Sequence, residues 1–199
     1  MNQFLPEELS NFLQVTDYYL TSRCELIIIG GAAASLAYGV TKTTSDIDTV
    51  SKIPDHLTVA LDLAKAKTGF SIPVSHVGVY EPPYNYETRL SLIENPILTK
   101  LQLFVPERHD LALMKIVRGY ENDIQVIEEI HQNIPLEFDI LVGRFMDEMT
   151  QVIGDLKSIR LSFLLMIEVL FGQEQAQEAE IISEKWESLS FQLENEQNP

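Results

Sequence analysis

The sequence predicts an α+β fold, with strands and helices mixed in residues 1–109 and a helical region in residues 110–199. Two observations support this prediction. Short apolar, β-branched runs bounded by glycine, proline or polar turns occur in the first half, as is typical of buried strands. From Asp110 onward, apolar residues recur at three- and four-residue spacing, which is the period of an amphipathic helix. We therefore expect an α/β core followed by a helical C-terminal region with an acidic tail.

The first elements are expected to be a helix, a strand and a second helix. Pro6, followed by two glutamates, is typical of a helix start, and this helix carries apolar residues toward a core (Leu9, Phe12, Leu13 and Leu20). Residues 25–30 are apolar and end in glycine, which predicts a buried strand. Residues 31–38 are small and rich in alanine, so we expect a short helix that Gly39 ends.

The rest of the first half alternates between strands and one helix. Asp46 to Val50 alternates polar and apolar residues like a strand, and residues 56–67 show helical spacing. Residues 72–80 and 86–93 are expected to form strands separated by a proline turn. Residues 99–104 would add a last strand.

The second half is expected to be helical throughout. One helix would run from Asp110 until Pro135 breaks it. Residues 136–171 would form one long helix or two shorter helices, with Gly154 as the break. Apolar residues from Ile181 to Phe191 indicate one more short helix.

Composition narrows the class of protein. The 199 residues are 45% hydrophobic, which argues against global disorder. A formal net charge of −16 does not favour nonspecific binding to a nucleic-acid backbone. The single cysteine, Cys24, excludes an internal disulfide framework. The start of the chain lacks the basic and apolar segments of a secretory signal, and no stretch has the length and apolarity of a membrane span. We expect a cytoplasmic, soluble protein.

One stretch carries recognisable chemistry. A strand ends at Gly30-Gly31, a small-residue helix follows, and the next strand opens with Asp46-x-Asp48. Side chains two residues apart on a strand point to the same side, so the two carboxylates project together. Paired carboxylates suit Mg²⁺, which prefers oxygen ligands. The glycines let backbone amides approach a phosphate, and the helix N-terminus favours its negative charge.

This stretch resembles the signature of the DNA polymerase β-like nucleotidyltransferases. The run Lys42-x-Thr44-x-Asp46-Ile-Asp48 is similar to the Arg-x-Thr-x-Asp-Ile-Asp of small bacterial members, including the AbiEii-type toxins of toxin–antitoxin and phage-defence systems. Residues 86–90 (Tyr-Glu-Thr-Arg-Leu) resemble their Tyr-Glu-x-Arg strand. Residues 110–118, followed by Asp123, resemble their Leu-x-x-Lys-x-x-x-Arg helix. The resemblance covers about residues 25–130 and implies a nucleotidyltransferase fold, with a mixed sheet flanked by helices.

The resemblance also implies the roles of individual residues. Asp46 and Asp48 would hold Mg²⁺, Glu87 is the candidate for a third metal carboxylate, and Lys115 would neutralise phosphate charge. The residues implied to contact the nucleotide are Gly30, Gly31, Ser35, Lys42, Thr44, Arg89 and Arg118.

The implied activity is Mg²⁺-dependent transfer of a nucleoside monophosphate (NMP) from a nucleoside triphosphate (NTP) to a hydroxyl of RNA, such as tRNA, or of a protein. A toxin-like or defence-related role follows, with a cognate antitoxin or toxin partner, and the chain could also form a homodimer. The alternative is a catalytically inactive module of the same fold that binds a partner, as an antitoxin-like or regulatory protein. Val126 and the lack of an obvious third carboxylate motivate that alternative.

Simpler interpretations stay open for several of these residues. The two glycines could form an ordinary strand–helix turn, and Glu87 could pair with Arg89. Lys115 could be a surface lysine that covers apolar neighbours with its stem. Arg118 and Asp123 could form a helix-surface pair.

Overall fold

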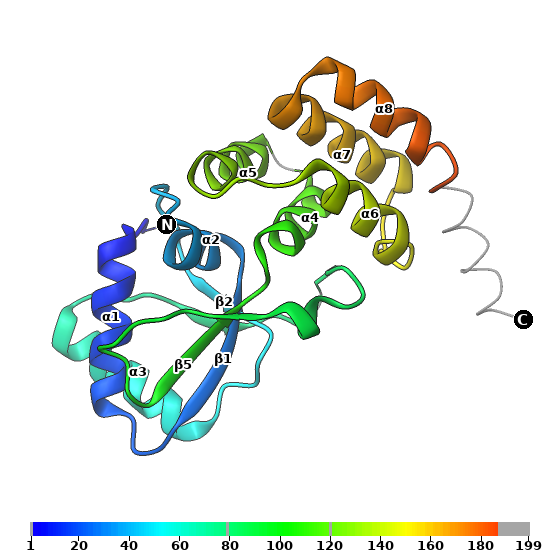
Figure 1. Cartoon of the computed structure of the whole chain (residues 1–199). Coiled ribbons are helices and arrows are strands. Elements are labelled where there is room, and N and C mark those ends of the chain that lie inside the picture. The colour runs from blue at the N-terminus through cyan, green and yellow to red at the C-terminus, as the bar shows by residue number, and fades with distance from the viewer. Residues whose placement is uncertain (1, 79, 120, 187–199) are drawn as a thin grey trace, which may run out of the picture. The chain divides into compact units, whose positions relative to one another are not determined.

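The computed structural model describes residues 2–78, 80–119 and 121–186 (Figure 1). The chain divides into two compact units. The first comprises Met1–Val79 and Arg89–Pro106, and the second comprises Tyr80–Thr88 and Glu107–Pro199. The second unit thus takes in a short segment from the first half of the sequence. The predicted α+β class, with a mixed sheet and a helical second half, is confirmed.

The first unit holds a five-stranded mixed sheet with the order β3-β2-β1-β5-β4. Strand β1 (Cys24–Ile29) runs parallel to β5 (Leu101–Val105) and antiparallel to β2 (Ile47–Thr49). The outer strands are β3 (Val74–His76), parallel to β2, and β4 (Ser91–Leu92), antiparallel to β5. The predicted strands at residues 25–30, 46–50 and 99–104 are therefore present.

Three helices accompany this sheet. Helix α1 (Pro6–Tyr19) packs along α3 (Asp55–Thr68), and α2 (Gly30–Tyr38) contacts β1 and β2 (Figure 1). The apolar face predicted for the first helix is the one that is buried. Helix α2 consists mainly of small residues, which lets its backbone lie close to the two strands. The start of α2 is thereby held beside β2.

The strand predicted over residues 86–93 is wrong for its first part. Tyr86–Arg89 forms a 3₁₀ turn, η1, and only Ser91–Leu92 pairs in the sheet. The carbonyl of Pro83 accepts the Tyr86 N–H at 3.0 Å, and the carbonyl of Asn85 accepts both the N–H and the hydroxyl of Thr88. These local bonds close the backbone into a turn, so Glu87 and Arg89 do not share a strand face.

The second unit contains five helices among its described residues. They are α4 (Arg108–Arg118), α5 (Glu121–Asn133), α6 (Phe138–Glu148), α7 (Leu156–Phe171) and α8 (Gln173–Ser183). Their shared core includes Phe145 stacked on Phe163, with ring centroids 3.9 Å apart, and Trp186 packed on the same Phe145. No helix in the described part of the chain has both the length and the apolarity needed to cross a membrane.

Two helix boundaries differ from the sequence prediction. The single helix expected from Asp110 to Pro135 is two helices, because Gly119 adopts a left-handed backbone (φ +64°) that ends α4. Of the two alternatives for residues 136–171, the pair of shorter helices is confirmed, with Gly154 in the connection. The last helix begins earlier than expected, at Gln173, and the predicted residues beyond Trp186 lie outside the described part of the chain.

A buried carboxylate joins the end of α1 to the start of β5. Asp17 is 4% exposed and accepts the backbone N–H groups of Thr99, Lys100 and Leu101 at 2.7–3.0 Å. Burial by itself raises the pKa of Asp17, but these backbone hydrogen bonds outweigh it and lower the pKa below its ordinary value. The charged form of Asp17 is therefore part of the folded state.

Replacing Asp17 by asparagine is expected to lower the free energy of unfolding by about 1–3 kcal/mol at neutral pH, because the bonds to a charged acceptor are weakened. The folded-state pKa is depressed, so the carboxylate stabilises the fold above its unfolded pKa of about 3.9 and loses this effect as the pH falls through the folded-state pKa. Urea unfolding at several pH values measures the difference in free energy of unfolding between the wild type and Asp17→Asn, with Asp62→Asn on the exposed face of α3 as control. If this difference stays the same in acid, the charged form of Asp17 does not stabilise the fold.

Candidate functional site

The predicted carboxylate pair lies on β2 and on the residue just before it, next to the start of α2. Asp48 pairs with Ile29, the last residue of β1, and α2 begins at the next residue. Ile47 and Thr49 are fully buried, whereas Asp46 and Asp48 are both partly exposed. This alternation places the two carboxylates on the opposite side of the strand from Ile47 and Thr49. The sequence prediction that Asp46 and Asp48 project together agrees with this burial pattern.

The two glycines bring the start of α2 close to this pair. Gly30 has a φ of +70°, and a Cβ at this position would lie 3.5 Å from the Asp48 carboxylate oxygen Oδ2. A Cβ at Gly31 would lie 2.8 Å from the Thr44 hydroxyl oxygen. The first turn of a helix has backbone N–H groups without intrahelical partners and carries a partial positive charge. An anionic group near Asp48 can therefore approach these amides directly.

Two of the predicted nucleotide contacts, Ser35 and Thr44, make hydrogen bonds to the loop that precedes β2. The Ser35 hydroxyl donates to the carbonyl of Lys42 at 3.3 Å, and the Thr44 hydroxyl donates to the carbonyl of Asp46 at 3.2 Å. Both side chains are nearly buried. Thr44 also exchanges two backbone hydrogen bonds with Phe4, at 2.8 and 3.1 Å. In the structure Ser35 and Thr44 position the loop that carries Asp46, whereas Lys42 is partly exposed on it.

A side chain at Gly31 is expected to disturb this loop. In Gly31→Ala the new methyl group would meet both the hydroxyl and the Cβ of Thr44, the latter at 3.2 Å. Thr44 cannot move away easily, because its hydroxyl is bonded to Asp46 and its backbone to Phe4. We expect a loss of about 1–3 kcal/mol in the free energy of unfolding.

A double-mutant cycle with Thr44→Ala tests the cause of this loss. Because Thr44→Ala removes the hydroxyl, the closer of the two atoms that the new methyl group would meet, the double variant should lose less than the sum of the single losses. Strict additivity of the two losses would show that the clash with the Thr44 hydroxyl is not the cause.

Lys115, Arg118 and Asp123 form an ion-pair cluster within the second unit. The Lys115 ammonium and the Arg118 guanidinium both donate to Asp123 Oδ1, at 2.8 and 2.9 Å. Lys115 is only 3% exposed, so the interpretation of Lys115 as a surface lysine is wrong. The alternative pair of Arg118 with Asp123 is present, but Asp123 is buried, so the pair lies on the helix surface only on the side of Arg118. Removing either the buried lysine or the buried carboxylate would leave the other as an unpaired charge in the interior.

Glu87 and Arg89 both come from the η1 turn. Glu87 is exposed and belongs to the second unit, whereas Arg89 is partly exposed and opens the second segment of the first unit. Over residues 2–78, 80–119 and 121–186, no group of three or more His, Cys, Asp or Glu side chains is arranged to hold a metal ion. The third-ligand role of Glu87 stays a prediction.

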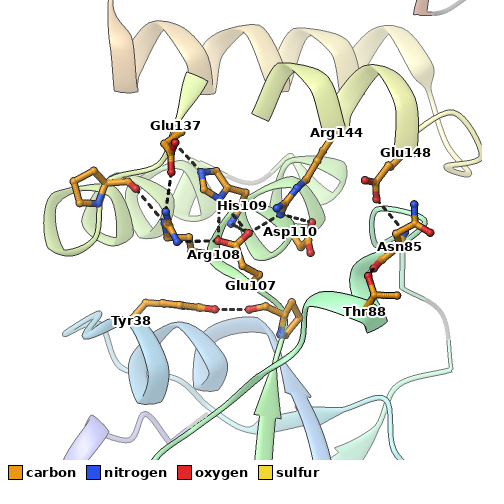
Figure 2. A network of polar contacts seen from close by, with 12 residues as sticks. Tyr38, Asn85, Thr88, Glu107, Arg108, His109, Asp110, Glu137, Arg144 and Glu148 are labelled. Carbon is orange, nitrogen blue, oxygen red and sulfur yellow. Dashed lines mark hydrogen bonds and ion pairs between the residues drawn. The ribbon is translucent and has the colours of Figure 1, made fainter. Parts of the chain in front are cut away.

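The sequence pattern missed a polar network in the second unit (Figure 2). Arg144 of α6 donates from one nitrogen to Glu107 and to Asp110, which is fully buried. The Glu137 N–H donates to His109 Nε2 at 2.8 Å, so the proton of this imidazole lies on Nδ1, which donates to Glu107 at 2.9 Å. The acidic start of a helix at Glu107 was visible in the sequence, but nothing local indicated its pairing with Arg144.

Burial raises the pKa of Glu107, but the bonds from His109 and Arg144 outweigh it and lower the pKa to about 2. Glu107 is therefore charged at any physiological pH. The network joins the start of α4 to α6 and stabilises their packing within the second unit.

The mixed sheet, with a Gly-Gly helix start beside an Asp-x-Asp strand, agrees with the resemblance of the motifs to nucleotidyltransferases. Residues 7–168 match the sequence model of a family described as nucleotidyltransferase of unknown function, DUF6036, and the chain belongs to this family. The family description does not extend to the AbiEii-type subgroup that the motifs resemble. No curated protein and no solved structure gives a significant match.

Proposed function

We propose that the protein transfers an NMP from an NTP to a hydroxyl group of RNA or protein, with Mg²⁺ bound by Asp46 and Asp48. The observation that supports this proposal is the position of the two carboxylates beside the glycine start of α2. A nucleotidyltransferase must hold a triphosphate and offset its charge. The amides of a helix N-terminus can hold a phosphate, and carboxylates beside it would bind the Mg²⁺ that offsets the phosphate charge.

The residues present fit Mg²⁺. The donors are two partly exposed carboxylates on one side of a strand, and Gly30 beside Asp48 has no Cβ. Mg²⁺ commonly takes one or two carboxylates together with substrate phosphates. When bound, this ion would supply positive charge that stabilises the triphosphate during transfer.

The residues of this chain bind and orient the substrate. The backbone N–H groups of the first turn of α2 would donate to phosphate oxygens, which the glycines leave accessible. Lys42 and Arg89, in the same unit as the carboxylates, would add positive charge near the phosphates. In the transfer, the acceptor oxygen forms a bond to the α-phosphorus, the bond from this phosphorus to pyrophosphate breaks, and the acceptor proton is released.

A toxin-like or defence-related role in the cytoplasm, with a cognate partner, is proposed on the motif resemblance. Glu87, Lys115 and Arg118 belong to the second unit, so the proposal does not depend on them.

A partner-binding module without catalysis is the second candidate function. The observation that favours it is the engagement of Lys115 by the buried Asp123. This ammonium, expected to neutralise phosphate charge, already has a partner of opposite charge.

A labelling assay separates the two functions. The purified protein is incubated with Mg²⁺ and each α-labelled NTP in turn, with total RNA and total cell protein as acceptors. Label transfer that the double variant Asp46→Asn, Asp48→Asn lacks would support the enzyme and identify both the base and the acceptor class. No transfer with any NTP, from folded protein, would favour the partner-binding module.

A further inference from the structure

Helices α7 and α8 of the second unit expose an apolar stripe that their own packing does not use. Leu161, Leu165 and Val169 follow each other at four-residue intervals along α7 and are 64%, 51% and 43% exposed. Residues at this spacing lie on one face of a helix. The opposite side of α7 carries Phe163, Met166 and Ile167, which are fully buried in the core. The helix therefore has a second apolar face directed to solvent.

Two residues of this stripe, Leu161 and Leu165, line a groove between α7 and α8, which lie side by side (Figure 1). The groove has a volume of about 380 Å³ and includes Leu161 and Leu165 from α7 and Ala176 from α8. Arg160 fixes the two helices to each other, because its guanidinium donates to the Glu180 carbonyl and to the Ser183 hydroxyl at 2.9 and 3.0 Å. The groove is thus built by a braced helix pair.

The charged residues that line the groove are both acidic, and two glutamines, Gln173 and Gln177, complete its polar lining. Glu168 and Glu180 line it and are exposed. From Glu168 to Glu184 the sequence has five glutamates and no lysine or arginine. A ligand of this groove needs apolar side chains at helical spacing to contact the leucines. It also needs positive charges to face the glutamates at the rim of the groove.

We propose that this groove binds a basic amphipathic helix of another protein. The charge of the rim argues against the two other candidate occupants. A second copy of this chain would bring a second set of glutamates against the first, and each chain carries a net charge of −16. The chain's own residues 187–199 hold three glutamates and no basic residue. A cationic helix matches both the leucines and the glutamates.

The test uses two synthetic helical peptides with the same leucine stripe, one with lysine and arginine at its polar positions and one with glutamate. Binding to the full chain is measured by fluorescence anisotropy at about 0.15 M salt, where long-range attraction between exposed charges is largely screened. We expect the basic peptide to bind at least tenfold more tightly than the acidic peptide. A photoreactive group at the centre of the basic peptide should crosslink to α7 and α8.

Matched variants locate the binding. Leu165→Ser should weaken the basic peptide about tenfold, whereas Val59→Ser, at an equally exposed apolar residue on α3, should change it less than twofold. With the charge reversal Glu168→Lys, Glu180→Lys, the acidic peptide should bind more tightly than the basic peptide. Equal losses in Leu165→Ser and Val59→Ser, or crosslinks outside α7 and α8, would overturn the proposal.

Two further results would identify a different occupant and also overturn the proposal. The first is a dimer in sedimentation that Leu165→Ser dissociates, which would make a second copy the occupant. The second is a gain of about tenfold in affinity for the basic peptide in Phe191→Asp, which would show that the chain's own end covers the groove.

Discussion

Replacing Asp48 by asparagine is expected to lower NMP transfer by on the order of 10²–10³-fold, the range seen when one preorganised electrostatic contact at a reacting centre is removed. Asp48 lies opposite the last residue of β1 and directly beside the glycine start of α2. Asparagine keeps the shape of the side chain but removes the negative charge that would hold the metal ion. The measurement is the initial rate of label transfer at saturating Mg²⁺.

Two controls make this result specific to Asp48. Asp62→Asn removes an exposed carboxylate from α3 in the same unit and should leave the rate within about twofold. Thermal unfolding of Asp48→Asn should stay close to that of the wild type, because this side chain is partly exposed. If Asp48→Asn retains most of the activity while remaining folded, Asp48 is not a metal ligand.

Asp46→Asn should lower the rate of label transfer as Asp48→Asn does, since both carboxylates share one side of the strand.

Replacing Arg144 by alanine is expected to lower the free energy of unfolding of the second unit by about 3–5 kcal/mol, which is the range for breaking a buried ion pair from one side. The variant would leave the fully buried Asp110 without this cation and would remove one donor from Glu107. Lys157→Ala, at an exposed residue of α7, is the matched control and should change stability by less than about 0.5 kcal/mol. A loss in Arg144→Ala no larger than in this control would show that the network does not stabilise the fold.

The same network predicts the acid sensitivity of the second unit. The pKa of Glu107 is lowered from 4.5 to about 2 in the folded state. Its contribution to stability is therefore complete above about pH 4.5 and is lost progressively as the pH falls toward about 2. In Arg144→Ala this dependence should be weaker, because one cause of the low pKa is removed. Urea unfolding between pH 2 and 6 measures how the free energy of unfolding changes with pH in the wild type and in Arg144→Ala.

The features of the candidate site that the sequence predicted and the structure contains are those formed by local structure. The Gly30-Gly31 turn and the alternation of Asp46 and Asp48 depend on the backbone of a strand and a helix start, which short sequence patterns encode. The carboxylates could therefore be assigned to one face of a strand before any tertiary contact was known. The same rules predicted the apolar face of α1 and a chain break near Gly154.

The residues that the sequence described wrongly depend on partners far along the chain or on a competing local turn. Asn85 donates its N–H to Glu148 of α6, and the 3₁₀ turn that follows carries Glu87 and Arg89 off any strand.

Sequence alone thus determined the α+β class, the strands at residues 25–30, 46–50 and 99–104, and the alternation around Asp46 and Asp48, because each follows from backbone periodicity and glycine conformation. Tertiary structure decided the buried pairing of Lys115 with Asp123 and of Arg144 with Asp110 and Glu107. A charged side chain looks the same in a sequence whether it faces water or a buried partner, and only packing distinguishes the two.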